Sequence, residues 1–327
     1  MPRPDDQRVQ RILSALALAT LLLPASAAAL LTPGRTVVNV APVTALSVTH
    51  RSVVWAVGRS KSDCGHVRLW DTASRGLWTL GRGTLRGCEE GPSGGFGISQ
   101  VASAGRRPFW VTHIGGNITD YQLWTATPTR QAPRRLAFAS AETGGPPAVV
   151  LGPGTQEGVP YAVGPTVTYV SAAGARLFRT TLGSPIRSLA AGTTFGGGRV
   201  VAALADGRVV VLSRTGALLD TEMFEPDEVR SLALASTGPV VQVARDVHLT
   251  HPDGRAGVVT LPAGGLMLDY RQRGIYYRVG RQLRLRLVGT GADTLLLDIA
   301  LRPWQPMLFS VDWGAGWATG RSVNWRT

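Results

Sequence analysis

Apolar and polar residues alternate along most of the chain, in segments of about five to eight residues separated by glycine-rich turns. Beyond residue 31, no segment keeps the 3.6-residue apolar period of an amphipathic helix. Alternation with period two, interrupted by a turn every 8 to 12 residues or so, is typical of short antiparallel strands with one buried face. The pattern therefore predicts an all-β fold.

These strands repeat with a period of about 40 residues. The segment Ile186-Arg187-Ser188-Leu189-Ala190 recurs as Val229-Arg230-Ser231-Leu232-Ala233, and similar strand-like segments begin at Met267 and Leu308. Four short strands in a repeat of this length are typical of one blade of a β-propeller, in which small sheets surround a central axis. The repeat therefore predicts a ring of blades.

A second repeated feature precedes one strand in each of five consecutive units. A small residue is followed by apolar residues three and five positions later, as Gly207 is followed by Val210 and Leu212. The other four sets are Gly164 with Val167 and Tyr169, Ala244 with Val247 and Leu249, Gly280 with Leu283 and Leu285, and Gly320 with Val323 and Trp325. The first four sets are followed by a turn and another strand, whereas the last is followed by the end of the chain.

Seven innermost strands are expected, and they number the blades from one to seven. They cover residues 44–49, 97–102, 148–151, 186–190, 229–235, 266–270 and 307–311. The seventh unit has only three strands, and residues 36–39 form a strand without a unit. We expect this N-terminal strand to pair with the strand that ends at Trp325. The prediction is a seven-bladed β-propeller of four-stranded antiparallel blades whose closure leaves no open edge in the ring.

One unit carries a motif known from other propellers. Arg68-Leu69-Trp70-Asp71 resembles the Trp-Asp ending of a WD repeat, and His251-Pro252-Asp253-Gly254 is similar to the Ser-Pro-Asp-Gly turn of the TolB type. Over about 290 residues the chain thus resembles, in architecture, the WD-repeat and TolB-type propeller superfamilies. The corresponding stretches of other units lack the Trp-Asp ending. The resemblance therefore implies a ring-shaped scaffold and no particular activity.

The N-terminal 31 residues are typical of a targeting segment. A basic stretch with Arg3, Arg8 and Arg11 precedes the charge-free residues 12–23, and a proline and the small residues Ala25-Ser26-Ala27 follow. This order matches a secretory signal peptide. We expect a cleaved signal peptide over residues 1–27, a short linker over 28–35 and a single propeller domain over 36–327. The expected product is secreted or extracytoplasmic, in the cell envelope.

A retained membrane anchor is the alternative for this segment. Residues 12–31 are long enough, at about 20 residues, to cross a bilayer, although they contain a proline and a Ser/Ala-rich end. No later segment approaches 18 consecutive apolar residues. After cleavage of the signal peptide, the remaining chain is therefore expected to lack a transmembrane segment.

Charge narrows the choice of partner. The 327 residues include 34 Lys and Arg against 21 Asp and Glu, which gives a net charge of +13. Loss of residues 1–27 removes three arginines and two aspartates and leaves +12. Lys61 is the only lysine, a bias typical of GC-rich coding, and we expect a bacterial protein. Outside the cytoplasm, a basic surface meets envelope polymers and lipid headgroups, so specific nucleic-acid binding is not expected.

The two cysteines fit an oxidising compartment. Cys64 falls in the loop between the second and third strands of blade one, and Cys88 in the connector to blade two. In an up-and-down blade these two loops lie on the same face of the ring. We expect a Cys64–Cys88 disulfide that closes a loop of about 25 residues and adds about 3 kcal/mol to the stability.

Motifs for chemistry are missing from the sequence. The five histidines have no metal-ligand spacing, and neither a Gly-x-Ser-x-Gly elbow nor a phosphate-binding loop ending in Gly-Lys occurs. We therefore expect no metal and no cofactor, and favour a non-catalytic binding protein. The alternative is a propeller enzyme, such as a hydrolase, lyase or quinone-dependent dehydrogenase, whose residues converge on the ring axis. Calcium or a quinone cofactor would then be expected.

One rim of the ring collects charged and aromatic residues around blades seven and one. Closure brings the two sequence clusters of the nine tryptophans together, and among them Trp304 stands between Pro303 and Pro306 in a connector. It is the best candidate for an exposed aromatic contact. The candidate binding residues are Arg59, Lys61, Asp63, Glu89, Glu90, Arg302, Trp304 and Arg321. We expect this patch to bind a protein or an anionic cell-envelope polymer, with the propeller as a monomer.

Overall fold

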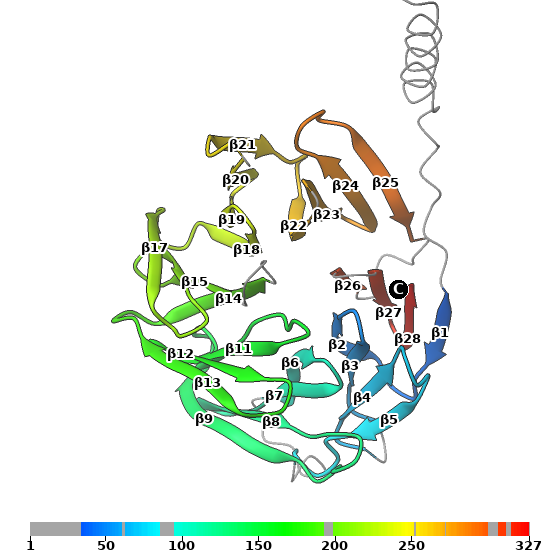
Figure 1. Cartoon of the computed structure of the whole chain (residues 1–327). Coiled ribbons are helices and arrows are strands. Elements are labelled where there is room, and N and C mark those ends of the chain that lie inside the picture. Colours follow the sequence, from blue (N-terminus) through cyan, green and yellow to red (C-terminus); the bar gives the residue numbers. More distant parts are fainter. Residues whose placement is uncertain are drawn as a thin grey trace, which may run out of the picture.

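The computed structural model describes residues 34–60, 63–85, 95–192, 199–251, 253–271, 273–299, 307–311 and 315–326. Within these ranges the chain forms seven four-stranded antiparallel sheets. Figure 1 shows the sheets following one another around a central axis in chain order. The seven-bladed propeller predicted from the repeats is confirmed.

In blades one to six the strands run from the innermost to the outermost position in chain order (Figure 1). Blade one has β2 (Val43–Val48), β3 (Ser52–Val57), β4 (His66–Asp71) and β5 (Leu77–Leu80). Blade two has β6 (Phe96–Ala104), β7 (Arg107–Gly115), β8 (Ile118–Thr125) and β9 (Arg134–Glu142). Blade three has β10 (Val149–Leu151), β11 (Gly158–Val163), β12 (Thr166–Ser171) and β13 (Arg176–Thr181).

The second half of the ring has the same order. Blade four has β14 (Ile186–Gly192), β15 (Arg199–Leu204), β16 (Arg208–Leu212) and β17 (Leu218–Met223). Blade five has β18 (Val229–Ala235), β19 (Gly238–Val243), β20 (Asp246–Thr250) and β21 (Ala256–Thr260). Blade six has β22 (Gly265–Arg271), β23 (Gly274–Val279), β24 (Gln282–Leu287) and β25 (Asp293–Asp298). Blade seven has β26 (Met307–Val311), β27 (Ala315–Thr319) and β28 (Ser322–Arg326), with β1 (Arg35–Val38) as its fourth strand.

The two ends of the propeller meet in blade seven. β1 pairs antiparallel with β28, with Arg35 opposite Trp325 and Val38 opposite Ser322. In Figure 1 the blue β1 lies beside the red β28. The predicted closure is thus confirmed, and the strand begins at Arg35, one residue earlier than expected. Residues 1–33 lie outside the described residues, and no helix in the described part of the chain is long and apolar enough to cross a membrane.

Apolar residues are buried between neighbouring blades rather than in one central core. Each junction between consecutive blades has its own cluster of buried apolar side chains, and the seven clusters follow the ring. The cluster between blades three and four, for example, joins Tyr169 and Phe178 to Ile186 and Leu212. Each blade therefore depends on both neighbours for the burial of its two faces.

The small residue repeated before the third strand has a conformational explanation. Gly164, Gly207, Gly280 and Gly320 have φ values of 54°, 88°, 54° and 56°, and Ala244 at the same place has 50°. A tight turn between the second and third strands requires this left-handed backbone, which glycine adopts without a steric penalty. The apolar residues three and five positions later then face the junctions: nine of the ten are buried and Leu285 is half-buried.

The other repeated segment marks a β-bulge in the innermost strand. Pairing with the second strand shifts between Ile186 and Ser188 in blade four and between Val229 and Ser231 in blade five. A bulge bends the strand and increases its twist. Next to the bulge in blade five, the Ser231 hydroxyl donates a 2.7 Å hydrogen bond to the Met267 carbonyl of blade six.

The left-handed turns make a paired prediction. Ala244→Gly is expected to raise the free energy of unfolding by about 0.5–1 kcal/mol, because relief of the strained φ exceeds the added entropy of the unfolded chain. Gly164→Ala is its inverse: a Cβ there meets no atom within 4 Å, so only backbone strain opposes it, and we expect a loss of about 1 kcal/mol. Urea denaturation measures both. A stabilised Gly164→Ala variant would contradict the explanation.

Candidate functional site

Three of the eight predicted rim residues lie among the described residues. Arg59 and Arg321 are exposed, whereas the side chain of Asp63 is only 16% exposed. Lys61, Glu89, Glu90, Arg302 and Trp304 lie outside the described residues, as does Cys88. The binding patch and the Cys64–Cys88 disulfide therefore stay predictions.

The loop between β3 and β4 is fixed by Asp63. The Ser60 N–H donates to the Asp63 carbonyl at 2.9 Å, which closes a narrow turn, and Asp63 Oδ1 accepts the Gly65 N–H at 2.9 Å. Gly65 is buried at a φ of 116°, where only glycine fits without strain. A side-chain carboxylate that accepts a backbone N–H two residues later stabilises a turn. Asp63 thus determines how Arg59 is presented.

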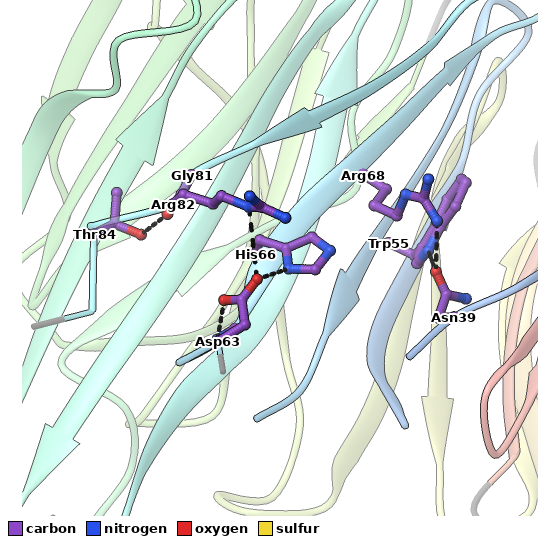
Figure 2. Close-up of polar contacts among 9 residues, drawn as sticks. Asn39, Trp55, Asp63, His66, Arg68, Gly81, Arg82 and Thr84 are labelled. Carbon is purple, nitrogen blue, oxygen red and sulfur yellow. Dashed lines mark hydrogen bonds and ion pairs between the residues drawn. The ribbon is translucent and has the colours of Figure 1, made fainter. Parts of the chain in front are cut away.

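Asp63 also joins this loop to the connector that follows β5. Its Oδ2 accepts a 2.7 Å hydrogen bond from His66 Nδ1 at the start of β4, and Arg82 Nε lies 3.6 Å from the same oxygen. Figure 2 shows dashed lines from one oxygen of this carboxylate to the imidazole and to the guanidinium group. The Arg82 side chain is 72% exposed. The ion pair therefore holds a cation at the surface of this rim without withdrawing it from solvent.

His66 is the buried member of this cluster. Burial lowers its pKa below the ordinary value, and the carboxylate of Asp63 acts in the opposite direction. The positive charges of Arg82 and Arg68 lower the pKa further. Since burial has the largest effect, the imidazole is neutral at neutral pH and donates its Nδ1 proton to Asp63.

Asn39 links the closing strand to both blade seven and blade one. Its buried amide oxygen accepts hydrogen bonds from Trp55 Nε1 at 2.9 Å and from Arg68 Nη1 at 3.3 Å, as Figure 2 shows. Its Nδ2 donates to the Arg321 carbonyl at 2.8 Å. One side chain at the end of β1 thus fixes the turn that carries Arg321.

Tryptophans pack beneath this cluster at the junction of blades seven and one. The Trp325 ring lies 5.9 Å from that of Trp55 and 5.7 Å from that of Trp70, between centroids. The Arg35 guanidinium lies over Trp70, 3.5 Å from the ring centroid. All three rings are buried. These three tryptophans therefore pack between blades seven and one. Trp124 in blade two is half-buried, and its Nε1 donates a 3.1 Å hydrogen bond to Thr112 Oγ1.

The Trp-Asp motif also has a structural role. Asp71, which follows Trp70, is buried and accepts hydrogen bonds from the Ala73 N–H at 3.2 Å and the Ser74 hydroxyl at 2.6 Å. It also pairs with Arg106 of the neighbouring blade at 2.9 Å. Asp71 lies at the opposite end of β4 from His66. The motif therefore fixes a turn on the other face of the ring and contributes no group to the rim.

The rim can recognise negative charge. Arg59, Arg82 and Arg321 are exposed on loops that leave the same end of their blades, and the carboxylate of Asp63 is already engaged. Guanidinium groups form bidentate contacts with carboxylate and phosphate. Among the described residues, no group of three His, Cys, Asp or Glu side chains is placed to hold a metal ion.

Sequence reasoning missed the residues that organise this rim. Asn39, His66, Arg68 and Arg82 were not expected to take part, although Asn39 ends the strand that closure predicts. His66 and Arg68 stand two residues apart, so they lie on one face of β4. Closure of the ring by β1, together with the alternation of side chains along β4, indicates that Asn39 and Arg68 lie near each other. The position of Arg82 depends on a connector whose course the strand pattern does not determine.

Comparison with solved structures supports the fold. The chain matches one in the crystal structure of the mitotic checkpoint complex with a TM-score of 0.57 and 13% identity, over 90% of this chain and 93% of that one. It also matches Raptor of Chaetomium thermophilum with a TM-score of 0.54 and 14% identity, over 89% of this chain and 28% of that one. No protein-family model and no curated protein sequence matches. The chain thus shares the fold of these proteins, which here is a seven-bladed propeller, and at these identities the likeness shows the fold alone.

The buried His66 predicts a loss of stability in acid. Its pKa is lower in the folded protein than in the unfolded chain, so below about pH 6.5 the unfolded chain binds the proton first and stability falls as the pH drops. His66→Asn, whose amide can donate to Asp63, is expected to reduce this loss. Some loss remains, because burial also lowers the pKa of His113. Urea denaturation between about pH 7.5 and pH 5 measures it, and an unchanged pH dependence would contradict the assignment.

Proposed function

We propose that this WD40-type propeller is an exported, non-catalytic binding scaffold. It recognises an anionic partner, either an acidic protein surface or a cell-envelope polymer, through the rim of blades seven and one. The likeness to other propellers supports a rigid ring that presents loops. Loops on a rigid scaffold are where binding residues concentrate. The residues assigned to contact the partner are Arg59, Arg82 and Arg321.

The observation that carries this proposal is the way in which the rim cations are held. Asp63 bonds to the backbone of its own turn and pairs with Arg82, and Asn39 fixes the turn of Arg321. Loops that are fixed before binding lose little conformational freedom when a partner arrives. A preorganised set of exposed guanidinium groups supports recognition of carboxylate or phosphate on an extended partner.

Export is the second part of the proposal. It is supported by the signal-like order of residues 1–27 and by the pair of cysteines, one of which, Cys64, lies in the loop next to Asp63. In an oxidising compartment a Cys64–Cys88 disulfide would join the two loops of the rim covalently. The net charge of +12 that remains after cleavage suits a surface that meets envelope polyanions.

Binding to defined polyanions tests the rim. Polygalacturonate and poly-glutamate are the probes, with neutral dextran for comparison, and binding is measured by biolayer interferometry at constant ionic strength. The triple variant Arg59→Gln, Arg82→Gln, Arg321→Gln is expected to weaken binding at least about tenfold, because several charge-assisted contacts are lost together.

The matched control carries three substitutions on the opposite face. Arg51→Gln, Arg75→Gln and Arg176→Gln remove the same charge from exposed sites at the other end of the strands, and binding is expected to stay within about twofold. An equal loss in both triple variants would mean that net charge alone attracts the probes. In that case the rim is not the binding site.

Export is tested separately. A fusion of residues 1–35 to alkaline phosphatase, which is active only outside the cytoplasm, is expected to show activity. The double substitution Leu16→Arg, Leu18→Arg should abolish it, because charge disrupts the apolar segment. Native protein collected from outside the cytoplasm is expected to contain no titratable thiol after unfolding without reductant. An inactive fusion or two free thiols would contradict the assigned compartment.

A further inference from the structure

A pocket lined by three arginines lies between blades two and three, on the face opposite the candidate rim. Its volume is about 230 Å³. It opens among the β8–β9 loop, the β12–β13 turn and the start of β7, all at the other end of the strands from the β3–β4 loop. The lining residues are Arg107, Thr125, Ala126, Thr127, Arg130, Ala132, Arg134, Ala173 and Gly174. None of them is acidic.

The β8–β9 loop has a defined shape. The Thr127 N–H donates to the Arg130 carbonyl at 3.1 Å, and the Arg130 N–H donates to Thr127 Oγ1 at 2.9 Å. Pro128 and Pro133 restrict the backbone on both sides of Arg130. The loop therefore holds Arg130 at the pocket by local hydrogen bonds and rigid residues rather than by an acidic partner.

Arg107 reaches across the blade junction to the neighbouring turn. Its Nε and Nη2 donate to the carbonyls of Ala172 and Ala173, each at 2.9 Å. Gly174 allows this approach, because a Cβ there would lie only 2.9 Å from the guanidinium carbon. Arg134 Nη2 donates to the Gly174 carbonyl at 3.3 Å. Neutral carbonyls thus fix two guanidinium groups without cancelling their charge.

Like charges are close together in this pocket. Burial lowers the pKa of Arg107, and the positive charge of Arg134 lowers it further. Arginine nevertheless stays protonated in proteins. The carbonyls hold the positive charges close together, and no carboxylate in the lining neutralises them. An anion that binds between the guanidinium groups therefore stabilises this arrangement.

We propose that this pocket binds a phosphate group, whether a soluble ligand or a lipid headgroup carries it. A guanidinium group matches the geometry of phosphate oxygens and can donate two hydrogen bonds to them. The volume of the cavity is several times the roughly 30 Å³ that one water molecule occupies in the liquid. The cavity therefore has room for a group of several heavy atoms. The proposal does not depend on the function assigned to the rim, since the two surfaces share no residue.

Two neighbouring arginines give a matched test. Arg134 lines the pocket, whereas Arg135 is exposed, follows it in β9 and lies with its guanidinium 5.7 Å from the Phe138 ring centroid. Either substitution by glutamine removes one charge. Titration calorimetry with inorganic phosphate at constant ionic strength is expected to show binding that Arg134→Gln weakens at least about tenfold and Arg135→Gln by less than about twofold.

Further arms identify the source of the phosphate group and exclude a general charge effect. Glycerol 3-phosphate tests a soluble phosphomonoester, and phosphatidic acid vesicles test a lipid headgroup, each against both variants. Binding of any of these three probes that Arg134→Gln weakens and Arg135→Gln preserves supports the pocket and identifies the source. No binding of the wild-type protein to any of them, or an equal loss in both variants, would overturn the proposal. Thermal unfolding of each variant confirms that the fold is intact.

Discussion

The packing of Trp325 against Trp55 and Trp70 is the contact on which the ring depends. It joins the last strand of the chain to blade one, while β1 completes the same sheet through the pairing of Arg35 with Trp325. Burial of large aromatic side chains is among the strongest single contributions to packing. Each of the other junctions joins blades that are consecutive in sequence. This one alone joins the two ends of the propeller domain.

The same junction positions the candidate rim. Asn39 directly follows β1, accepts a hydrogen bond from Trp55 of the tryptophan cluster and donates one to the carbonyl of Arg321. Asp63 and His66 organise the adjacent loop of blade one. A residue that takes part in closing the ring therefore also positions an exposed arginine of the rim. The arginine pocket belongs to a different junction, between blades two and three, and takes its shape from loops of those blades.

The sequence predicts the parts of this structure that repeat. Gly207 and its counterparts in other blades mark left-handed turns, and the segments that begin at Ile186 and Val229 mark bulges. Both the turns and the bulges therefore recur periodically in the sequence. Blade count and closure follow from them. Single side-chain contacts do not repeat: Asn39 and Arg107 act through partners from other blades. Their roles require the positions of those partners, which local strand patterns do not contain.

Closure of the ring by its ends also determines the order of events during folding. Arg35 and Trp325 are paired in blade seven, although 290 positions (325 minus 35) separate them in the sequence. Contacts at such separation form late, because a long loop must close before they can form. The junctions of blades one to six can assemble as soon as neighbouring repeats are present, whereas blade seven waits for β28. Folding of the complete ring is thus completed only after the final strand has been synthesised.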